Sequence, residues 1–210
     1  AAGYKAGFTN PPMLEKAGPD GPMSGVMFRD FTVASGGALK RSDFGPGTLV
    51  EAEISFRMRG DLPARDAIYT DDEVLAAVDS AILGIEMAVP RINDPLGQPM
   101  VHLAADNGAA MGFVVGPDIP DWRSRDLMTL DIELLFDGEV VSEGMPLPAR
   151  CDEVWSLAWI VNHFSARGVN IKAGDYMTTG AAAAPKPLGN AGEVIARFAG
   201  VGDVRVTIEG

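Results

Sequence analysis

The sequence is poor in cysteine, in basic residues and in long apolar runs. Its single cysteine, Cys151, cannot form a disulfide within the chain, so we expect a reducing compartment, the cytoplasm. Lys and Arg number 17 against 29 Asp and Glu, and the formal net charge of −12 argues against nucleic acid or an anionic membrane as a partner. No apolar run reaches the roughly 18 residues of a membrane span. The first ten residues lack a basic region followed by an apolar stretch, so we expect no secretory signal peptide.

The composition is that of a globular protein. Hydrophobic residues occupy 47% of the 210 positions and charged residues 22%, which supplies enough apolar material for a sizeable core. Glycine (25 residues) and proline (15 residues) are frequent, and they predict many turns in a β-rich fold. Neither a repeat nor a linker interrupts the sequence, so we expect residues 1–210 to form a single catalytic domain.

Periodicity and turn residues predict two helices among several strands. Thr70 is followed three residues later by Glu73, a capping box, and the apolar stripe behind it predicts a helix over 70–82. Asp152 is the expected N-cap of a second helix over 153–167. Strands are expected at 49–58, at 84–92, on both sides of the Asp137-Gly138 turn within 130–141, and within 193–210.

The expected strand LVEAEISFRM (49–58) carries Glu51 and Glu53 on one face. Because side chains alternate along a strand, its apolar residues share the opposite face, which requires a core. The two glutamates lie one pleat apart, roughly 7 Å between Cα atoms. In water they would cost little, but in a cleft they would repel unless a proton or a cation lay between them. The stretch therefore fits either a solvated strand face or half of a divalent-metal site, since cations such as Mg²⁺ prefer carboxylate oxygens.

A third carboxylate favours the metal site. Glu86 is the one charge in the apolar segment GIEMAV (84–89), and buried carboxylates are rare unless they are paired or bound to metal. His102 and His163 show no metal-ligand spacing, so we expect ordinary structural or surface roles for them.

The order of several segments resembles a known family. The segments are GYKAGFT (3–9), VEAEISFRMRGDLP (50–63), GIEMAVPRI (84–92), ADNGAAMGFVVG (105–116), SLAWIVNHFSARGVNIKAGDYMTTG (156–180) and GEVIARFAGVG (192–202). Together they resemble the 2-keto-4-pentenoate hydratase / 2-oxohepta-3-ene-1,7-dioic acid hydratase family, within the fumarylacetoacetate hydrolase superfamily. The resemblance covers nearly the whole chain and implies an α+β, β-rich fold: a mixed β-sheet roll of the fumarylacetoacetate hydrolase C-terminal-domain type. The family's usual N-terminal helical segment before GYK is absent, so we expect either a truncated chain or the loss of part of the usual dimer and active-site wall.

The same resemblance assigns roles to individual residues. It implies that Mg²⁺ or Mn²⁺ is held by Glu51, Glu53 and Glu86. Lys5 matches the lysine of GYK, which would neutralise charge, orient a water or, if desolvation lowered its pKa, exchange a proton. Without the resemblance, Lys5 is typical of a surface lysine near a chain end.

The implied ligand is a small 2-oxo or 2-hydroxy acid. Thr179 and Gly180 match the loop that holds the substrate carboxylate, through the threonine hydroxyl and the glycine N–H; the alternative for residues 178–180 is a strand-end turn. The resemblance also implies a homo-oligomer, a dimer or larger.

The sequence departs from the family pattern where protons are moved. Hydratases of the family often read PDYG where this chain has PMSG (22–25), so Met23 or Ser24 stands in place of the acidic residue. The serine of the family's DNAS falls on Ala109, and the DSR after the third glutamate reads VPR. The metal-binding carboxylates are thus present while part of the proton-transfer machinery is not.

Three functions remain open from the sequence. The first, which we favour, is a divalent-metal-dependent hydratase that adds water to a 2-hydroxyalka-2,4-dienoate, giving a 4-hydroxy-2-oxo acid in aromatic-compound catabolism. The second is a metal-dependent decarboxylase of a 2-oxo-diacid, of the 4-oxalocrotonate type, whose enolate chemistry needs no acid at PDYG. Hydrolytic C–C cleavage is disfavoured because no histidine precedes His102. The third is a non-catalytic relative that binds a metal or an oxo acid.

Overall fold

The computed structural model describes residues 1–210 except for the side chain of Asp20. Its helices are α1 (Pro11–Ala17), α2 (Asp71–Ala76), α3 (Met100–Ala105) and α4 (Glu153–Ser165). Its strands are β1 (Gly3–Gly7), β2 (Met23–Met27), β3 (Thr32–Ala34), β4 (Ala38–Lys40), β5 (Leu49–Met58), β6 (Val78–Ala88), β7 (Gly112–Asp118), β8 (Ile132–Phe136), β9 (Glu139–Glu143), β10 (Tyr176–Ala181), β11 (Lys186–Pro187), β12 (Glu193–Phe198) and β13 (Gly202–Glu209).

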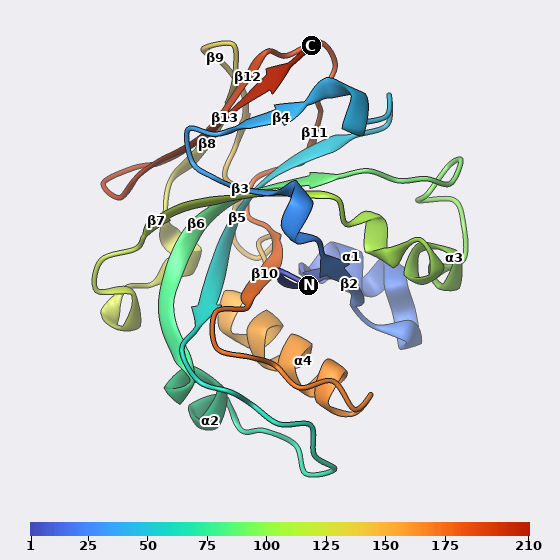
Figure 1. Cartoon of the computed structure of the whole chain (residues 1–210), viewed down its shortest axis with the longest axis vertical. Helices are drawn as coiled ribbons and strands as arrows, with labels where there is room; N and C mark the ends of the chain where they lie inside the picture. The colour runs from blue at the N-terminus through green and yellow to red at the C-terminus, as the bar shows by residue number, and fades with distance from the viewer.

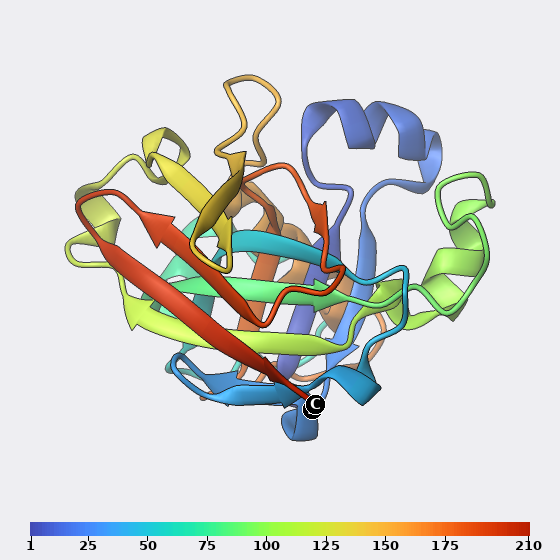
Figure 2. The ribbon, with the colours of Figure 1, turned by 90° about the horizontal axis from the view of Figure 1, so that it is seen from above.

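The strands form two mixed sheets (Figure 1). The larger has the order β2-β1-β10-β5-β6-β7-β3, with β11 also paired to β5, and the smaller has the order β4-β13-β12-β8-β9. The pairs β1–β10, β3–β7 and β4–β13 are parallel, and the remaining pairs are antiparallel. Figure 2 shows β13 running across β6 and β7, which places one sheet over the other. The expected β-rich α+β fold with mixed sheets is confirmed.

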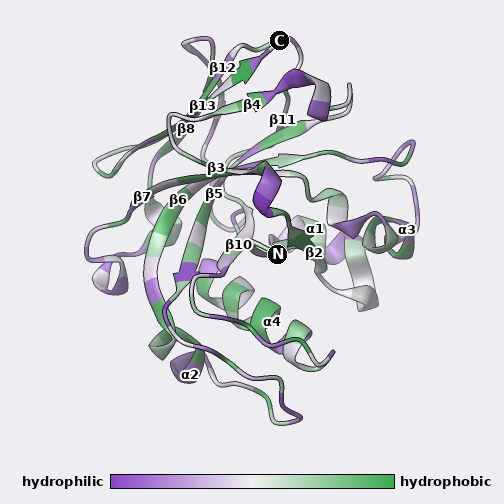
Figure 3. Ribbon diagram, in the orientation of Figure 1, coloured by the Kyte–Doolittle hydropathy of each residue, from purple (hydrophilic) through white to green (hydrophobic). Residues whose placement is uncertain are grey.

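One face of β5 packs into the main core. Val50, Ala52, Ile54 and Phe56 are completely buried in a cluster that also holds residues of α4 and β12. Burial of each large side chain contributes about 1.5–3 kcal/mol relative to exposure. Hydrophobic residues accordingly run along β5, β6 and α4 (Figure 3). The helix and the smaller sheet therefore cover the same face of the larger sheet.

The opposite face of β5 carries Glu51, Glu53 and Ser55. It lies beside a separate small apolar cluster made of Ala2, Met27, Ile82 and Phe113. Cross-strand partners in a sheet place their side chains on the same face. The register of β5 with its neighbours therefore decides which residues lie beside the glutamates.

The helix expected over 70–82 is correct at its start and wrong at its end. Thr70 and Glu73 form the capping box, but α2 ends at Ala76, and Val78 already begins β6. Pairing of β6 with β5 along ten register positions overrides the helical periodicity, as tertiary contacts often do. The second expected helix is confirmed as α4, with Asp152 as its N-cap. No helix in the described chain combines the length and apolarity needed to span a bilayer.

Candidate metal centre

Three glutamates meet on the face of the larger sheet that points away from the main core. Glu51 on β5 is directly opposite Glu86 on β6, and Glu53 is opposite Gly84. Each carboxylate offers an oxygen, and these oxygens all lie within 4.8 Å of one another. Glu53 and Glu86 are at most 1% exposed, and Glu51 is partly buried. The alternative of a solvated strand face is therefore excluded.

Lys5 joins the glutamates from the neighbouring edge of the sheet. It lies on β1, and its Nζ donates a hydrogen bond of 2.5 Å to Glu86 Oε1. Only 3% of the residue is exposed, which excludes the alternative of a surface lysine. Burial alone would lower the pKa of Lys5, but the charges of Glu86 and Glu51 outweigh it and raise the pKa above its ordinary value. Lys5 is thus a cation and a proton donor in this arrangement.

The simultaneous ionisation of all three glutamates is unfavourable in the absence of a bound cation. Burial, followed by the charge of Glu86, raises the pKa of Glu51 to about 7. The same two causes, in the same order, raise the pKa of Glu53 well above its usual range. A positive charge in their midst would reverse both effects, because it favours the ionised carboxylates.

The donor set fits a hard divalent cation. Glu53 Oε1 and Glu86 Oε2 are buried and have no hydrogen-bond partner among the described residues. Buried polar atoms of this kind are otherwise costly, at about 1–3 kcal/mol or more for each charged group. The three carboxylates (−3) and Lys5 (+1) leave a formal charge of −2, which a divalent cation neutralises. Carboxylate oxygens are the ligands that Mg²⁺, Mn²⁺ and Ca²⁺ prefer.

Gly180 holds one of the glutamates in place. Its N–H donates a 3.1 Å hydrogen bond to Glu53 Oε2. The φ of Gly180 is +112°, and a Cβ there would lie 2.1 Å from Thr9 Oγ1, so only glycine fits. Thr9 Oγ1 in turn donates 2.7 Å to the carbonyl of Thr179. The backbone at 179–180 is thereby fixed against both β5 and the segment that follows β1.

The two donors predicted to bind substrate, the Thr179 hydroxyl and the Gly180 N–H, are already engaged. The Thr179 hydroxyl is buried and donates 2.6 Å to the carbonyl of Ile54, while the Gly180 N–H is taken by Glu53. Their expected contact with a substrate carboxylate therefore stays a prediction. Thr178, which sequence reasoning did not single out, faces the same side as Lys5 and Ser55 through its register with both. Strand alternation along residues 176–178 is the sequence pattern that could have indicated Thr178.

The segment PMSG places an apolar residue beside Lys5. A Cβ at Gly7 would lie 3.5 Å from Met23 Cε and 3.9 Å from Lys5 Cε, so the two side chains flank one spot. Ser24 pairs with Ala6 and faces the opposite side of the sheet, where its Oγ lies 2.9 Å from His163 Nε2. Of the two residues that stand in place of the family's acid, the methionine is thus the one on the Lys5 side of the sheet.

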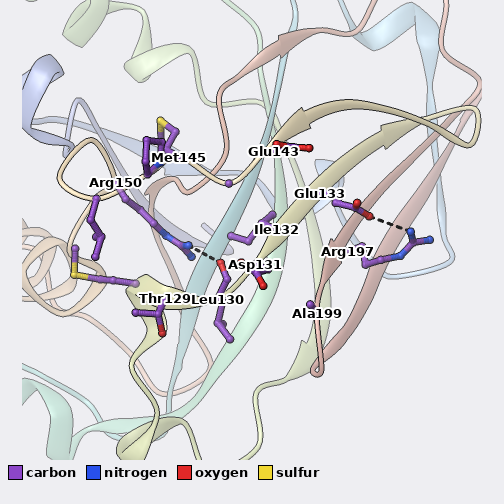
Figure 4. Close-up of a pocket in the computed structure, with 14 residues that line it drawn as sticks. Thr129, Leu130, Asp131, Ile132, Glu133, Glu143, Met145, Arg150, Arg197 and Ala199 are labelled. Carbon is purple, nitrogen blue, oxygen red and sulfur yellow. Dashed lines mark hydrogen bonds and ion pairs between the residues drawn. The ribbon is translucent and has the colours of Figure 1, made fainter.

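A cavity elsewhere in the molecule is not the centre. It measures about 650 Å³ and lies between the β8–β9 hairpin and the segments around 128–131 and 145–150. Figure 4 shows that its arginines are already paired, Arg150 with the carbonyl of Leu130 and Arg197 with Glu133. None of the predicted site residues lines it. The volume of this cavity therefore gives no reason to place the reaction there rather than at the glutamates.

Comparisons with known proteins agree with this geometry. The chain matches no protein-family model. It is 29% identical over 205 residues to a 2-keto-4-pentenoate hydratase of Burkholderia vietnamiensis (strain G4 / LMG 22486), covering 98% of this chain and 77% of that protein. The chain is related to the 2-keto-4-pentenoate hydratases.

Comparison of this chain with solved structures identifies its fold. The structure of 4-oxalocrotonate decarboxylase from Pseudomonas putida G7, complexed with magnesium and adipate, superimposes with a TM-score of 0.85 at 26% identity, covering 99% of this chain and 77% of that one. A putative fumarylacetoacetate hydrolase family protein from Yersinia pestis CO92 superimposes with a TM-score of 0.67 at 15% identity, covering 98% and 90%. The chain has the fumarylacetoacetate hydrolase fold, as its sequence predicts.

Proposed function

We propose that the chain is a divalent-metal-dependent hydro-lyase that adds water to a 2-hydroxyalka-2,4-dienoate and yields a 4-hydroxy-2-oxo acid. One observation carries the proposal: three converging carboxylates, two of them with unpartnered buried oxygens, lie beside a buried lysine. Relatives named 2-keto-4-pentenoate hydratase and 2-hydroxyhexa-2,4-dienoate hydratase support the substrate class. Such substrates arise in the breakdown of aromatic compounds.

The assigned roles follow from the contacts. Glu51, Glu53 and Glu86 would hold Mg²⁺ or Mn²⁺, which supplies Lewis-acid stabilisation of an enolate. The ammonium of Lys5 neutralises the negative charge that the substrate brings, and it holds a proton within reach of Glu86. Gly180 orients Glu53, and Thr179 fixes the strand beneath it. If the predicted substrate contact at Gly180 forms, its N–H must be shared with Glu53 or released from it.

A decarboxylase of a 2-oxo-diacid is the second candidate. Met23 favours it, because the apolar side chain offers no proton where the hydratase pattern has an acid. The similarity to 4-oxalocrotonate decarboxylase in both sequence and structure supports the same alternative. Loss of carbon dioxide from such an acid requires stabilisation of the enolate at C2 and no added water.

We also propose that the chain works as a homo-oligomer in the cytoplasm. Large apolar side chains such as Ile68 and Leu147 are more than half exposed, and a second copy would cover surfaces of this kind. The one cysteine is free and buried, as suits a reducing compartment. Size-exclusion chromatography with light scattering tests the first statement, since a monomer at micromolar concentration would contradict it.

A direct assay decides between the two activities. Freshly generated 2-hydroxypenta-2,4-dienoate is incubated with the protein and Mg²⁺ or Mn²⁺, the dienol absorbance is followed, and products are weighed by mass spectrometry. A gain of one water that disappears in Glu51→Gln/Glu53→Gln supports the hydratase. Release of carbon dioxide from a 2-oxo-diacid without hydration supports the decarboxylase. Absence of any metal-dependent turnover of either substrate contradicts both and leaves a non-catalytic binding protein.

A further inference from the structure

Two hydroxyls lie on the glutamate face, one pleat beyond Glu53. Ser55 follows Glu53 by two residues on β5, and Thr178 on β10 is its cross-strand partner. Thr178 is also the register partner of Lys5 on β1. All three residues therefore point to the side of the sheet that carries the carboxylates.

Neither hydroxyl is used by the protein itself. Ser55 Oγ and Thr178 Oγ1 are in residues that are 0% exposed, and neither has a hydrogen-bond partner in the part of the chain that the structure describes. An unsatisfied buried polar group destabilises the folded state, whereas alanine and valine would fill the same space without that cost. The neighbouring Thr179 hydroxyl, in contrast, is satisfied by the carbonyl of Ile54.

The surroundings separate charged from apolar groups at this point. On one side are Glu53 and Lys5; on the other is the small apolar cluster that includes Ile82, the β6 partner of Ser55. Gly84 packs closely against Ser55 and the Phe113 ring, since a Cβ there would lie 3.1 Å from Ser55 Oγ and 2.9 Å from Phe113 Cε2. The two hydroxyls thus line the end of the polar strip that begins at the metal ligands.

The hydroxyls of Ser55 and Thr178 are placed to bind a small polar molecule between them. Cross-strand partners have Cβ atoms about 4.5–5.5 Å apart, a separation that one water molecule bridges with a hydrogen bond to each hydroxyl. One hydroxyl donates to that water and the other accepts from it, because each can do either. The water keeps a lone pair and a second O–H for reaction.

We propose that Ser55 and Thr178 hold the water molecule that adds to the substrate. The inference rests on the proposed hydratase function and deepens it. The acidic end of the substrate belongs at the Lys5 and glutamate end of the strip, and C4 lies two bonds beyond C2, toward the hydroxyl pair. Ser55 and Thr178 are positioning residues in this scheme, because they act through the water.

The step is balanced without any further reactant. The water oxygen forms a bond to C4 of the 2-oxo-3-enoate, and the C3–C4 π electrons move to generate the enolate of the C2 ketone. The water loses one proton, and the enolate gains one at C3 as the ketone is restored. The net change is the addition of one water.

The test separates tautomerisation of the dienol from the addition of water. Ser55→Ala, Thr178→Val and the double variant are assayed for loss of dienol absorbance and, by mass and proton NMR, for the 2-oxo-3-enoate and the hydrated product. We expect the dienol to disappear at a rate within about threefold of wild type, and hydrated product to form about tenfold more slowly, the effect of losing one hydrogen bond. The 2-oxo-3-enoate should then accumulate. Thr178→Ser, which keeps the hydroxyl, should restore hydration.

Ser156→Ala is the matched control. It removes another buried hydroxyl without a partner in the described chain, on α4, and should leave the product ratio unchanged. An unaltered ratio in both Ser55→Ala and Thr178→Val would overturn the inference, as would an equal fall in both steps or a rise in KM alone. If Thr178→Val fails to fold, Ser55→Ala carries the test. A wild type that leaves the dienol unchanged contradicts the proposed function itself, whereas a hydrating wild type with equally hydrating variants contradicts only the water site.

Discussion

The ammonium of Lys5 lies 2.5 Å from Glu86 Oε1, and both side chains are at most 4% exposed. The two residues are 81 positions apart in the chain and come from strands at different places in the sheet. A buried ion pair contributes little net stability, but removal of one partner leaves a charge without compensation. The pair is therefore better explained by the chemistry of the centre than by folding.

Lys5→Met should reduce activity strongly. The variant removes the cation that balances the carboxylates and the substrate, so we expect kcat/KM to fall about 10²–10⁴-fold, the range for loss of a general acid or base. It should also cost about 3–5 kcal/mol in urea unfolding of the metal-free protein, because Glu86 loses its partner. Lys40→Met, at an exposed position, is the control and should change neither quantity. Wild-type activity in Lys5→Met would remove Lys5 from the mechanism.

Met23→Asp should raise the share of hydration. The substitution places a carboxyl group beside Lys5, where this chain has an apolar side chain. We expect the ratio of hydrated product to decarboxylated or merely tautomerised product to increase about tenfold or more, as an added acid supplies a proton. Met23→Asn has similar size and no acid, so it controls for packing. Equal ratios in the two variants would show that the missing acid does not limit hydration.

Gly180→Ala should damage the centre more than a comparable glycine substitution elsewhere. Both Gly180 and Gly138 have positive φ, but only a Cβ at Gly180 meets a neighbouring atom, Thr9 Oγ1. We expect Gly138→Ala to cost about 1–2 kcal/mol from backbone strain alone. Gly180→Ala should cost more and should weaken metal affinity, because the N–H to Glu53 shifts. Equal losses of stability with unchanged metal affinity would show that Gly180 does not position Glu53.

His163 should make stability depend on pH. Burial, and secondarily the charge of Arg167, lowers the pKa of His163 to about 4, whereas an unfolded histidine titrates near about 6.5. The unfolded chain therefore binds more protons in this window, and the contribution of His163 to stability is lost as the pH falls from about 6.5 toward 4. The half-exposed position makes the effect modest.

Urea unfolding at several pH values measures this effect by comparison of variants. Burial raises the pKa of Glu153 to about 7, which gives the opposite slope, so wild type alone is not informative. His163→Gln should lose less stability than wild type between pH 6.5 and 4.5. His102→Gln, the exposed histidine, serves as control. Parallel pH curves for wild type and His163→Gln would contradict the assignment.

The carboxylates were predictable because their signal is local. A period of two places Glu51 and Glu53 on one strand face, and Glu86 is conspicuous as a lone charge in an apolar strand. Their convergence follows from the β5–β6 register, which joins two segments that are near in sequence. The same pairing explains why the predicted end of α2 is wrong. Residues with a helical apolar spacing belong instead to β6, an 11-residue strand.

The surroundings of the carboxylates were less predictable. The contact between Lys5 and Glu86 depends on strand order across the sheet, which periodicity does not contain. Thr178 and Thr179 are adjacent, and the pairing of Thr178 with Ser55 and with Lys5 decides which hydroxyl faces the centre. Motif matching selected Thr179, whereas the structure leaves the hydroxyl of Thr178 as the unpartnered one on the glutamate face.

Metal binding by the three glutamates is the central claim, and calorimetry tests it most directly. Chelator-treated wild type is titrated with Mg²⁺ and with Mn²⁺, beside Glu51→Gln/Glu53→Gln and a control pair on the β8–β9 hairpin, Glu133→Gln/Glu143→Gln. We predict one ion per chain for wild type and for the hairpin variant, and affinity reduced at least about 100-fold in Glu51→Gln/Glu53→Gln, because two charged ligands are lost. Circular dichroism confirms that each variant is folded. Equal affinity in wild type and Glu51→Gln/Glu53→Gln would contradict the account.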